Sequence, residues 1–220
     1  MLSIIIPALN EAESIAQTLQ PLQGMRERGC EVIVADGGSS DATVEMARSL
    51  ADRVMASGRG RARQMNAGAA TASGEVLWFL HADTRVPEEA DREIAQAGSS
   101  WGRFAVKLSG RHPLLGLVAF LMNRRSCLTG IATGDQGIFV RRSLFEAIGG
   151  FPDQPLMEDI ALSRLLKRTA GRPACLNTRL ITSSRRWEQN GILRTIGLMW
   201  WLRFAYAMGA SPARLARLYR

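Results

Sequence analysis

The segment "EVLWFLHADT", residues 75–84, decides the fold class of this 220-residue chain. Five apolar residues, 76–80, follow one another without interruption, as in a strand that is buried on both faces of a parallel sheet. Directly after them, His81, Ala82 and Asp83 bring an imidazole and a carboxylate to the end of the strand. Open α/β sheets bind their ligands beyond the carboxyl ends of the strands. The segment therefore predicts both a buried strand and a binding site at its tip.

Strand and helix patterns alternate on the amino-terminal side of this segment. "LSIII" (2–6), "EVIVAD" (31–36) and "RVMAS" (53–57) predict strands, and helices are expected over about 11–25, 42–51 and 61–72. This alternation predicts an α/β fold with a mainly parallel central sheet flanked by helices. Three of the strands are followed by the polar segments "PALNE", "DGGSSD" and "HADT", which are expected to converge at one edge of the sheet.

The second half of the chain is less regular. We expect a strand over 101–110, an apolar helix over 112–125, and a loop and strand over 134–142. A helix is expected around 143–150, and 155–169 reads as a loop that enters an amphipathic helix. Two further helices, separated near Pro212, are expected at the C-terminal end. No apolar run approaches the ~20 residues that a membrane-spanning helix needs.

The charge of the chain is unevenly distributed. The 28 basic residues exceed the 20 acidic ones, and residues 185–220 hold seven arginines and one acid, Glu188. Such a segment suits an anionic membrane surface or a phosphate-bearing ligand. No nucleic acid partner is expected, because the chain has no base-reading motif. The C-terminal helices leave three interpretations open, namely peripheral membrane contact, closure of the core and a homodimer contact.

The cysteines and the first residues bear on location. Cys30, Cys127 and Cys175 are widely spaced without a CxxC pair, which predicts small core residues in a reducing compartment and no disulfide or metal framework. "MLSIIIPALNE" predicts a strand rather than a signal peptide, because it has neither a basic start nor a cleavage site. The expected location is the cytoplasm, with the inner face of the membrane as a peripheral variant.

Two polar segments suit a nucleotide. Asp36 ends a strand and precedes two glycines, so its carboxylate is placed to accept hydrogen bonds from a base or ribose, although a simple turn residue fits equally well. Arg59, Arg61 and Arg63 surround an expected helix start, where they suit a diphosphate or form a solvated basic turn.

Asp83 is the candidate metal ligand. A lone carboxylate at a phosphate site holds Mg²⁺ or Mn²⁺ together with phosphate oxygens and water. The alternative is a cap for a helix near Pro87. His81 is expected either to contact a ribose or the metal, or to be an ordinary satisfied polar residue.

Two more segments carry charged groups. Glu158 and Asp159 begin a helix, where acids complement the helix dipole or where a carboxylate acts as a general base. Arg186 and Trp187 in "SRRWEQ" suit a phosphate clamp with a stacking platform, or a surface arginine beside a core tryptophan.

Taken together, the chain resembles the family 2 glycosyltransferases, the inverting group with the GT-A fold. The likeness is strongest to small, soluble bacterial members, some of which are associated with arsenosugar biosynthesis. It implies a single catalytic domain over 1–187, with a nucleotide-binding half over 1–85 and an acceptor half over 100–187, and a C-terminal helical extension over 188–220. The resemblance rests on six segments in chain order: "SIIIPALNEAESI", "VIVADGGSSDAT", "GRGRARQMNAGAATASGEVLWFLHADT", "GDQGIFVRR", "MEDIALSRLLKR" and "RRW".

The resemblance implies transfer of a sugar from a nucleotide-diphospho-sugar, a UDP- or GDP-sugar, to a hydroxyl of a small-molecule or lipid acceptor, with a divalent cation (Mg²⁺ or Mn²⁺) as cofactor. Asp159 matches the family's catalytic base and Asp83 its metal-binding carboxylate, with Asp135 as the second candidate for the base. The implied donor-binding residues are Pro7, Ala8, Asn10, Glu11, Asp36, Arg61, Arg63, His81, Ala82 and Arg186, and the implied acceptor-binding residues are Asp135, Glu158 and Trp187.

Two positions depart from the family's pattern. His81 stands where an Asp is usual, and Ser183 stands where processive members have Gln. The histidine is expected to weaken metal binding or to change the ribose contact. Ser183 and the lack of an apolar run long enough to span a membrane favour transfer of one sugar over polysaccharide synthesis. A sugar nucleotidyltransferase, which releases pyrophosphate, and a non-catalytic sugar-nucleotide binding protein are the competing interpretations.

Overall fold

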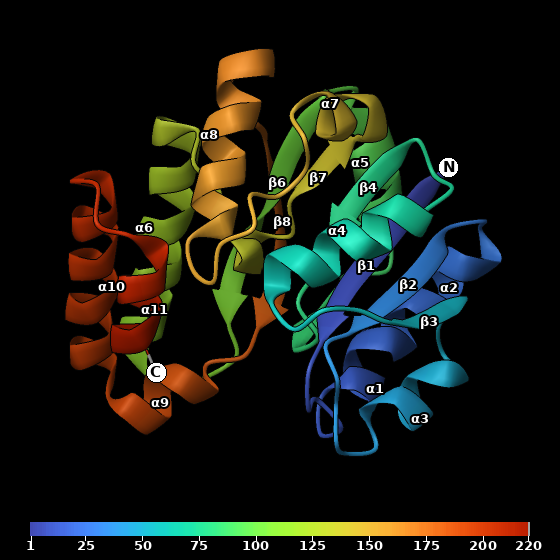
Figure 1. The fold of residues 1–220 in the computed structure, drawn as a ribbon, viewed down its shortest axis with the longest axis horizontal. Coiled ribbons are helices and arrows are strands. Elements are labelled where there is room, and N and C mark those ends of the chain that lie inside the picture. The colour runs from blue at the N-terminus through green and yellow to red at the C-terminus, as the bar shows by residue number, and fades with distance from the viewer. Residues whose placement is uncertain (220) are drawn as a thin grey trace.

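A computed structural model describes residues 1–219 (Figure 1). Within these residues eight strands form one sheet in the order β3-β2-β1-β4-β7-β6-β8-β5. Helices lie on both faces of the sheet, and the last three helices stand beside α6 at one end of the molecule (Figure 1). The strands are β1 Leu2–Ala8, β2 Glu31–Asp36, β3 Arg53–Ala56, β4 Val76–Phe79, β5 Thr84–Arg85, β6 Trp101–Leu108, β7 Phe139–Arg141 and β8 Ala174–Thr182.

The pairing of the strands is mainly parallel, as the sequence predicts. β1 pairs in parallel with β2 and β4, β2 with β3, and β6 with β8. β7 runs antiparallel to both β4 and β6, and β5 runs antiparallel to β8. Because β7 is reversed, the residues that precede it lie at the edge of the sheet where β4 ends.

The expected helices appear in the expected order, α9 is an additional helix, and one expected helix needs correction. The single helix expected over 11–25 is interrupted: α1 begins only at Ile15, and a 3₁₀ turn containing Pro21 separates it from α2. Proline has no backbone N–H to donate, so it interrupts a regular helix. Asn10 does not cap this helix; its side chain accepts a hydrogen bond from the Ser40 N–H instead. The helices are α1 Ile15–Leu19, η1 Gln20–Leu22, α2 Gln23–Glu27, α3 Thr43–Arg48, α4 Arg61–Thr71, α5 Ala90–Ala97, α6 Pro113–Thr129, η2 Gly134–Gln136, α7 Arg142–Ala147, α8 Glu158–Ala170, α9 Arg185–Asn190, α10 Ile192–Ala207 and α11 Pro212–Tyr219.

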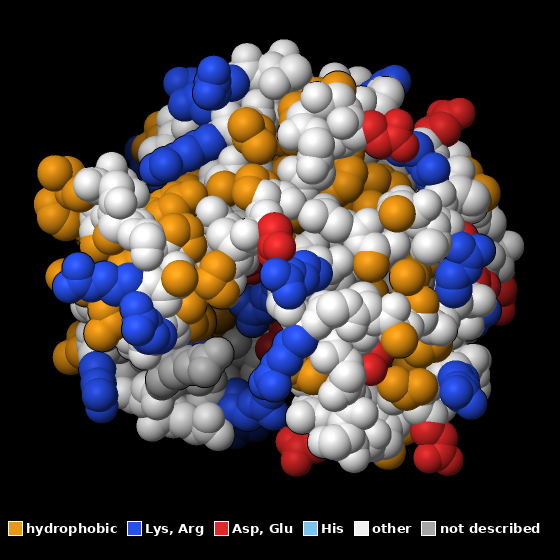
Figure 2. Space-filling model, viewed as in Figure 1, with side chains coloured by type: hydrophobic (Ala, Val, Ile, Leu, Met, Phe, Trp, Pro, Cys, Tyr) orange, Lys and Arg blue, Asp and Glu red, His pale blue; other side chains and the backbone are white. Residues whose placement is uncertain are grey.

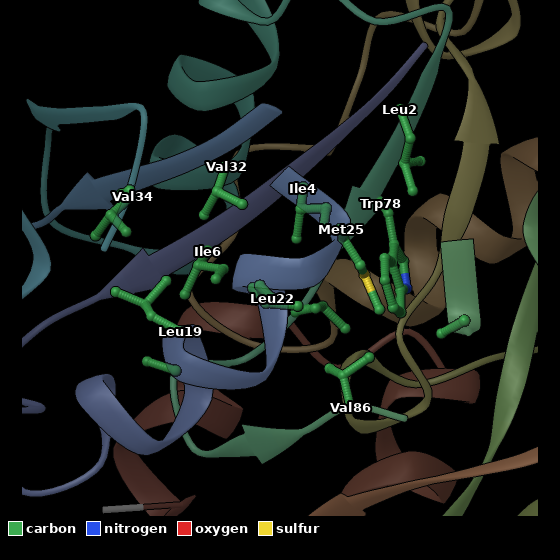
Figure 3. Close-up of a cluster of buried hydrophobic side chains, with 14 of the residues drawn as sticks. Leu2, Ile4, Ile6, Leu19, Leu22, Met25, Val32, Val34, Trp78 and Val86 are labelled. Carbon is green, nitrogen blue, oxygen red and sulfur yellow. The ribbon is translucent and has the colours of Figure 1, made fainter. Parts of the chain in front are cut away.

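The core confirms that β4 is buried on both faces. Trp78 packs with Ile4 and Ile6 of β1 on one face (Figure 3), whereas Leu77 and Phe79 point into a second cluster on the other face. Each fully buried apolar side chain of this size contributes about 1.5–3 kcal/mol relative to exposure. A rigid, doubly covered strand therefore carries the residues that follow it.

The C-terminal helices pack against the segment that begins α8. Leu202 of α10 and Leu215 of α11 are buried against Leu156, Met157 and Ile160. Within residues 1–219 no helix is both long enough and apolar enough to cross a bilayer.

One expectation about the cysteines is wrong. Cys127 of α6 and Cys175 of β8 form a disulfide, with their Cα atoms 6.1 Å apart. The two residues are 48 positions apart in the chain and meet only because α6 packs across the β6–β8 pair. Cys30 remains free.

Candidate active site

Loops that follow β1 and β2 are joined at the carboxyl edge of the sheet. The Asn10 side-chain oxygen accepts a hydrogen bond from the Ser40 N–H at 2.9 Å, and the Glu11 N–H donates to the Thr43 hydroxyl at 2.7 Å. Asn10 has a positive φ of 54°, a conformation that L-residues rarely adopt and that is held here by these bonds. The two loops therefore form one rigid wall of the site.

Asp36 presents an unpaired acceptor to this wall. Its Oδ2 accepts hydrogen bonds from the Gly38 and Ser39 N–H groups, each at 3.0 Å. Its Oδ1 is buried and has no partner among the described residues. An unsatisfied buried acceptor costs about 1–3 kcal/mol, so such an atom in a folded protein indicates a missing donor. Asp36 is thus a turn residue that also keeps an unpaired buried acceptor.

Pro7 and Ala8 lie beneath these loops. Both are buried at the end of β1, and the Ala8 carbonyl accepts hydrogen bonds from the Gly37 N–H and the Gln64 side chain. Pro7 and Ala8 therefore lie under the joined loops, and direct contact with a nucleoside stays a prediction for both.

His81 joins the end of β4 to the η2 turn. Its Nδ1 lies 3.3 Å from the Asp135 carboxylate. Burial opposes protonation of the imidazole most strongly, but the bond to Asp135 and the negative charges of Asp135 and Asp83 together outweigh it, and the pKa of His81 is raised. The same bond lowers the pKa of Asp135 although desolvation acts in the opposite direction. The ring also rests against Gly134, where an added Cβ would collide with Nε2.

Asp159 is held at the start of α8 by two backbone donors. Gly134 N–H donates to its Oδ2 at 2.9 Å, and Ile160 N–H donates to its Oδ1 at 2.7 Å. Burial raises the pKa of Asp159 in spite of these bonds, and burial together with the neighbouring Asp159 also raises the pKa of Glu158. Met157 lies just before them and has a positive φ of 65°. Among the described non-glycine residues, only Asn10 and Met157 have a positive φ.

A small cavity lies beneath these groups. Its polar lining is formed by His81, Gly134 and the two acids, and its apolar lining explains why the carboxylates are desolvated. The residues around it are Met65, Phe79, His81, Gly134, Ile138, Phe151, Glu158 and Asp159. A carboxylate with a raised pKa, fixed by backbone donors at the mouth of a sheet, is suited to accept a proton.

Asp83 and Ala82 complete the end of β4. Ala82 is buried, and its carbonyl accepts a hydrogen bond from the Thr18 hydroxyl at 2.7 Å. Asp83 is half-buried, and within residues 1–219 no side chain or backbone group is bonded to its carboxylate. It does not cap the next helix, since α5 begins at Ala90 after Glu89. The same residues contain no group of three or more His, Cys, Asp or Glu that could hold a metal alone. A cation here needs oxygens from its ligand, which fits a single free carboxylate facing a diphosphate.

The family model described as "Glycosyl transferase family 2" matches residues 3–98 of this chain. A protein of Mycobacterium tuberculosis (strain CDC 1551 / Oshkosh) named "Uncharacterized glycosyltransferase MT1564" is 31% identical over 163 residues, covering 68% of this chain and 62% of that protein. Residues 3–98 of this chain belong to glycosyltransferase family 2. "Probable glycosyltransferase YdaM" of Bacillus subtilis (strain 168) is 26% identical over 73% of this chain and 45% of its own length. This family 2 chain therefore spans about half to three fifths of these relatives.

Solved structures confirm the GT-A fold of this family 2 chain. Staphylococcus aureus TarS 1-349 in complex with UDP-GlcNAc aligns with a TM-score of 0.65 and 21% identity, covering 83% of this chain and 58% of that one. The mannosyltransferase PcManGT of Pyrobaculum calidifontis, in complex with GDP-Man and Mn²⁺, aligns with a TM-score of 0.63 and 20% identity, covering 82% and 56%. At this identity the likeness concerns the fold.

The family pattern implies three arginines, Arg61, Arg63 and Arg186, and each lies in a different setting. Arg61, at the start of α4, feels the charges of Glu158, Asp135 and Asp159, which raise its pKa against the effect of desolvation. Arg63 instead forms an exposed ion pair with Asp153 at 3.0 Å, so the structure does not bring it to this group.

The "RRW" segment of this family 2 chain meets the last helix. Arg186 lies 3.5 Å from the centre of the Tyr219 ring and also donates a hydrogen bond to the Tyr219 carbonyl. Trp187 packs against Leu115, Val118 and neighbouring apolar residues of α6 and α10. The core interpretation of Trp187 therefore has direct support, and its role in acceptor binding stays a prediction.

Three residues of the site escaped the sequence analysis. Gly134 contacts His81 and bonds Asp159, Tyr219 covers Arg186, and Arg125 of α6 is a half-buried cation whose pKa is lowered by burial and partly restored by Asp159. The "GDQ" motif contained the signal for Gly134, because a glycine beside a predicted site residue often permits close approach. Nothing in the local sequence marks Arg125 or Tyr219.

Proposed function

We propose that this chain transfers one sugar from a nucleoside-diphosphate-sugar to a hydroxyl acceptor, with inversion at the anomeric carbon. The observation that carries the proposal is the position of Asp159: a desolvated carboxylate held by Gly134 beside His81, at the tip of β4, which also carries Asp83. Relatives named as glycosyltransferases, and solved structures with UDP-GlcNAc or GDP-Man bound, support the reaction class.

The donor nucleotide would lie across the joined β1 and β2 loops. Asp36 Oδ1 is available to accept a hydrogen bond from a base N–H or a ribose hydroxyl, and Asn10 and Glu11 line the same wall. Arg61 and Arg186 supply positive charge for the diphosphate. Figure 2 shows the face hollowed near its centre, with blue basic side chains around the hollow.

Asp83 is the residue that would hold a divalent cation. When bound, the cation neutralises charge that develops on the departing diphosphate. The Mn²⁺ in the mannosyltransferase complex supports a divalent cation as cofactor. His81, paired with Asp135, stands beside Asp83 with a raised pKa and supplies a hydrogen-bond donor where most family members have a second carboxylate.

Asp159 is the general base of the proposed reaction. It takes the proton of the acceptor hydroxyl while that oxygen attacks the anomeric carbon from the side opposite the diphosphate. The bond to the diphosphate breaks as the new bond forms, which inverts the configuration. Glu158 and Asp135 border the space where the acceptor must stand, and we assign them to acceptor binding. We assign residues 1–187 to the catalytic domain and the following helices to an extension of it.

The test is a product assay with UDP- and GDP-sugars and Mn²⁺, using slow transfer to water where no acceptor is known. We expect release of a nucleoside diphosphate and a loss on the order of 10³-fold in Asp159→Asn. Glu146→Gln, which alters an exposed acid on α7, is the matched control and should retain full activity. Release of pyrophosphate would support a nucleotidyltransferase. Donor binding without turnover in any condition would support a binding protein.

A further inference from the structure

Large exposed hydrophobic side chains gather on the last helices and on α6. Apart from Met1 and Met46, all such residues among those described lie on α6, α10 and α11 or, for Met208, directly after α10. Figure 2, in the orientation of Figure 1, shows orange and blue side chains over these helices. The residues are Leu117, Phe120, Leu121, Leu128, Leu193, Trp200, Trp201, Phe204, Met208 and Leu218. We call this set the apolar face.

The apolar face of α10 is a continuous stripe. Leu193, Trp200, Phe204 and Met208 follow one another at helical spacing, and Trp200 is 70% exposed and Met208 74% exposed. A helix on the surface of a soluble protein normally turns its polar side to water. α10 buries Leu202 and Thr195 inward and presents large apolar groups outward as well.

α6 continues the same surface. Leu115 and Val118 of α6 pack with Ile192 and Ile196 of α10, which fixes the two helices side by side. A hollow lies where the two helices begin, lined by His112, Leu114, Gly191, Ile192, Leu193 and Arg194. The exposed apolar residues of both helices therefore belong to one region rather than to scattered sites. Contiguous exposed apolar surface of this kind marks an interaction site.

The charge of these helices is entirely positive. α6, α10 and α11 contain no Asp or Glu, and within residues 1–219 no ion pair engages their arginines. The arginines of these helices outside the candidate site are Arg124, Arg194, Arg203, Arg214 and Arg217, whereas the guanidinium of Arg125 is buried. A second copy of the same face would bring arginines against arginines. An anionic surface provides the missing charge, and its apolar interior accepts tryptophan and phenylalanine side chains.

We propose that the apolar face docks this protein on the surface of a bilayer that contains anionic lipids. α10 lies in the plane of the interface, with Trp200 and Trp201 at the level of the headgroups and with Arg194 and Arg203 against phosphates. Because α10 and α11 pack on the residues just before Glu158 and Asp159, docking places the acceptor side of the site beside the lipid. The docking claim itself does not depend on the proposed function.

Vesicle flotation of the full chain tests the proposal. We expect the protein to float with vesicles that contain phosphatidylglycerol and to stay behind with phosphatidylcholine alone. The variant Trp200→Ser/Phe204→Ser should lose binding by on the order of tenfold or more, because two large apolar groups no longer enter the interface. Met46→Ser, which removes an exposed methionine on α3, is the matched control and should bind like the wild type.

The electrostatic part has its own variant pair. Arg194→Gln/Arg203→Gln should weaken binding on the order of tenfold, and added salt should weaken the wild type in the same direction. Arg48→Gln, an exposed arginine on α3, should have no effect. Circular dichroism of each variant establishes that it is folded, so lost binding reports on the surface.

Tryptophan fluorescence identifies the docking residues directly. Trp78 and Trp101 are buried and Trp187 packs against α6, whereas Trp200 and Trp201 are exposed, so brominated lipids should quench the last two most strongly. Equal binding to neutral and anionic vesicles, no binding to either, or sedimentation as a dimer that Trp200→Ser/Phe204→Ser dissociates would each overturn the proposal.

Discussion

Residues 1–98 and residues 99–219 reach the same site by different means. In the first part, β1, β2 and β4 run in parallel, and each delivers the loop that directly follows it. In the second part, the site residues stand before the reversed strand β7 and at the start of α8. The family model matches only the first of these two parts, residues 3–98.

In the proposed reaction, this difference separates donor binding from acceptor binding. The donor wall depends on short loops whose geometry is set locally, as in the Asp36 turn. The acceptor side depends on long-range packing, and Gly134 joins the two, since it touches His81 of the first part and bonds Asp159 of the second. Substitutions at the donor wall, at the junction and on the acceptor side should therefore have distinguishable effects.

The largest effect is expected at the tip of β4. Asp83→Asn should lower turnover on the order of 10²–10³-fold, because the carboxylate that anchors charge stabilisation at the diphosphate is lost. Titration of activity with Mn²⁺ is the measurement, and removal of the cation by chelation should affect the wild type similarly. Glu88→Gln, an exposed acid in the following loop, serves as control. If activity of Asp83→Asn depended on Mn²⁺ as in the wild type, Asp83 would not be a metal ligand.

The junction itself is tested by Gly134→Ala. The new Cβ must displace the His81 ring, and the N–H that holds Asp159 shifts with it. A misplacement of about 1 Å costs on the order of 10² in rate, so kcat should fall by that factor while donor affinity changes little. Gly116→Ala on α6 adds a Cβ that meets nothing within 4 Å, and its kcat should equal that of the wild type. Normal kcat in Gly134→Ala would break the proposed link between the two parts.

The donor wall alone is tested by Asp36→Asn. The amide oxygen can still accept from Gly38 and Ser39, but an NH₂ group replaces the unpaired Oδ1 acceptor. Donor affinity should fall about tenfold to a hundredfold, measured by titration calorimetry with a nucleoside diphosphate. Glu45→Gln on α3 is the neutral comparison. If only kcat changed, Asp36 would act outside nucleotide binding.

The acceptor side predicts a pH dependence. The base must be ionised, and burial raises the pKa of Asp159, so kcat/KM should decline as pH falls through a value above the ordinary range of an aspartate. Glu158→Gln removes a neighbouring negative charge and should move this decline to lower pH. A profile in which the variant declines at higher pH than the wild type contradicts the assignment.

The smallest effect is expected where α11 covers Arg186. Tyr219→Ala removes the ring that orients the guanidinium and should raise the KM for the donor about threefold, in line with a cation–π contact of 0.5–1 kcal/mol. Tyr206→Leu removes a comparable ring from Arg164, outside the site, and should leave this KM unchanged. A lower KM in Tyr219→Ala would mean that the ring competes with the donor.

Much of the fold followed from patterns only a few residues long. The apolar run of 76–80 predicted a doubly buried strand, and polar segments after the strands predicted where Asp36 and Asp83 would lie. Burial and strand direction depend on such local patterns, since period and turn chemistry act over neighbouring residues. The helix expected over 11–25 failed for the same local reason, a proline and a loop-bound Asn10.

Contacts across long stretches of chain were decided only by the tertiary structure. Gly134 meets Asp159 at a separation of 25 residues, Arg186 meets Tyr219 at 33, and Cys127 meets Cys175 at 48. The outward apolar stripe of α10 was also decided by the tertiary structure. Because α10 has hydrophobic residues on several sides, its sequence does not predict which side its neighbours cover. Periodicity describes a residue relative to its own element, whereas the packing of elements sets which side chains meet.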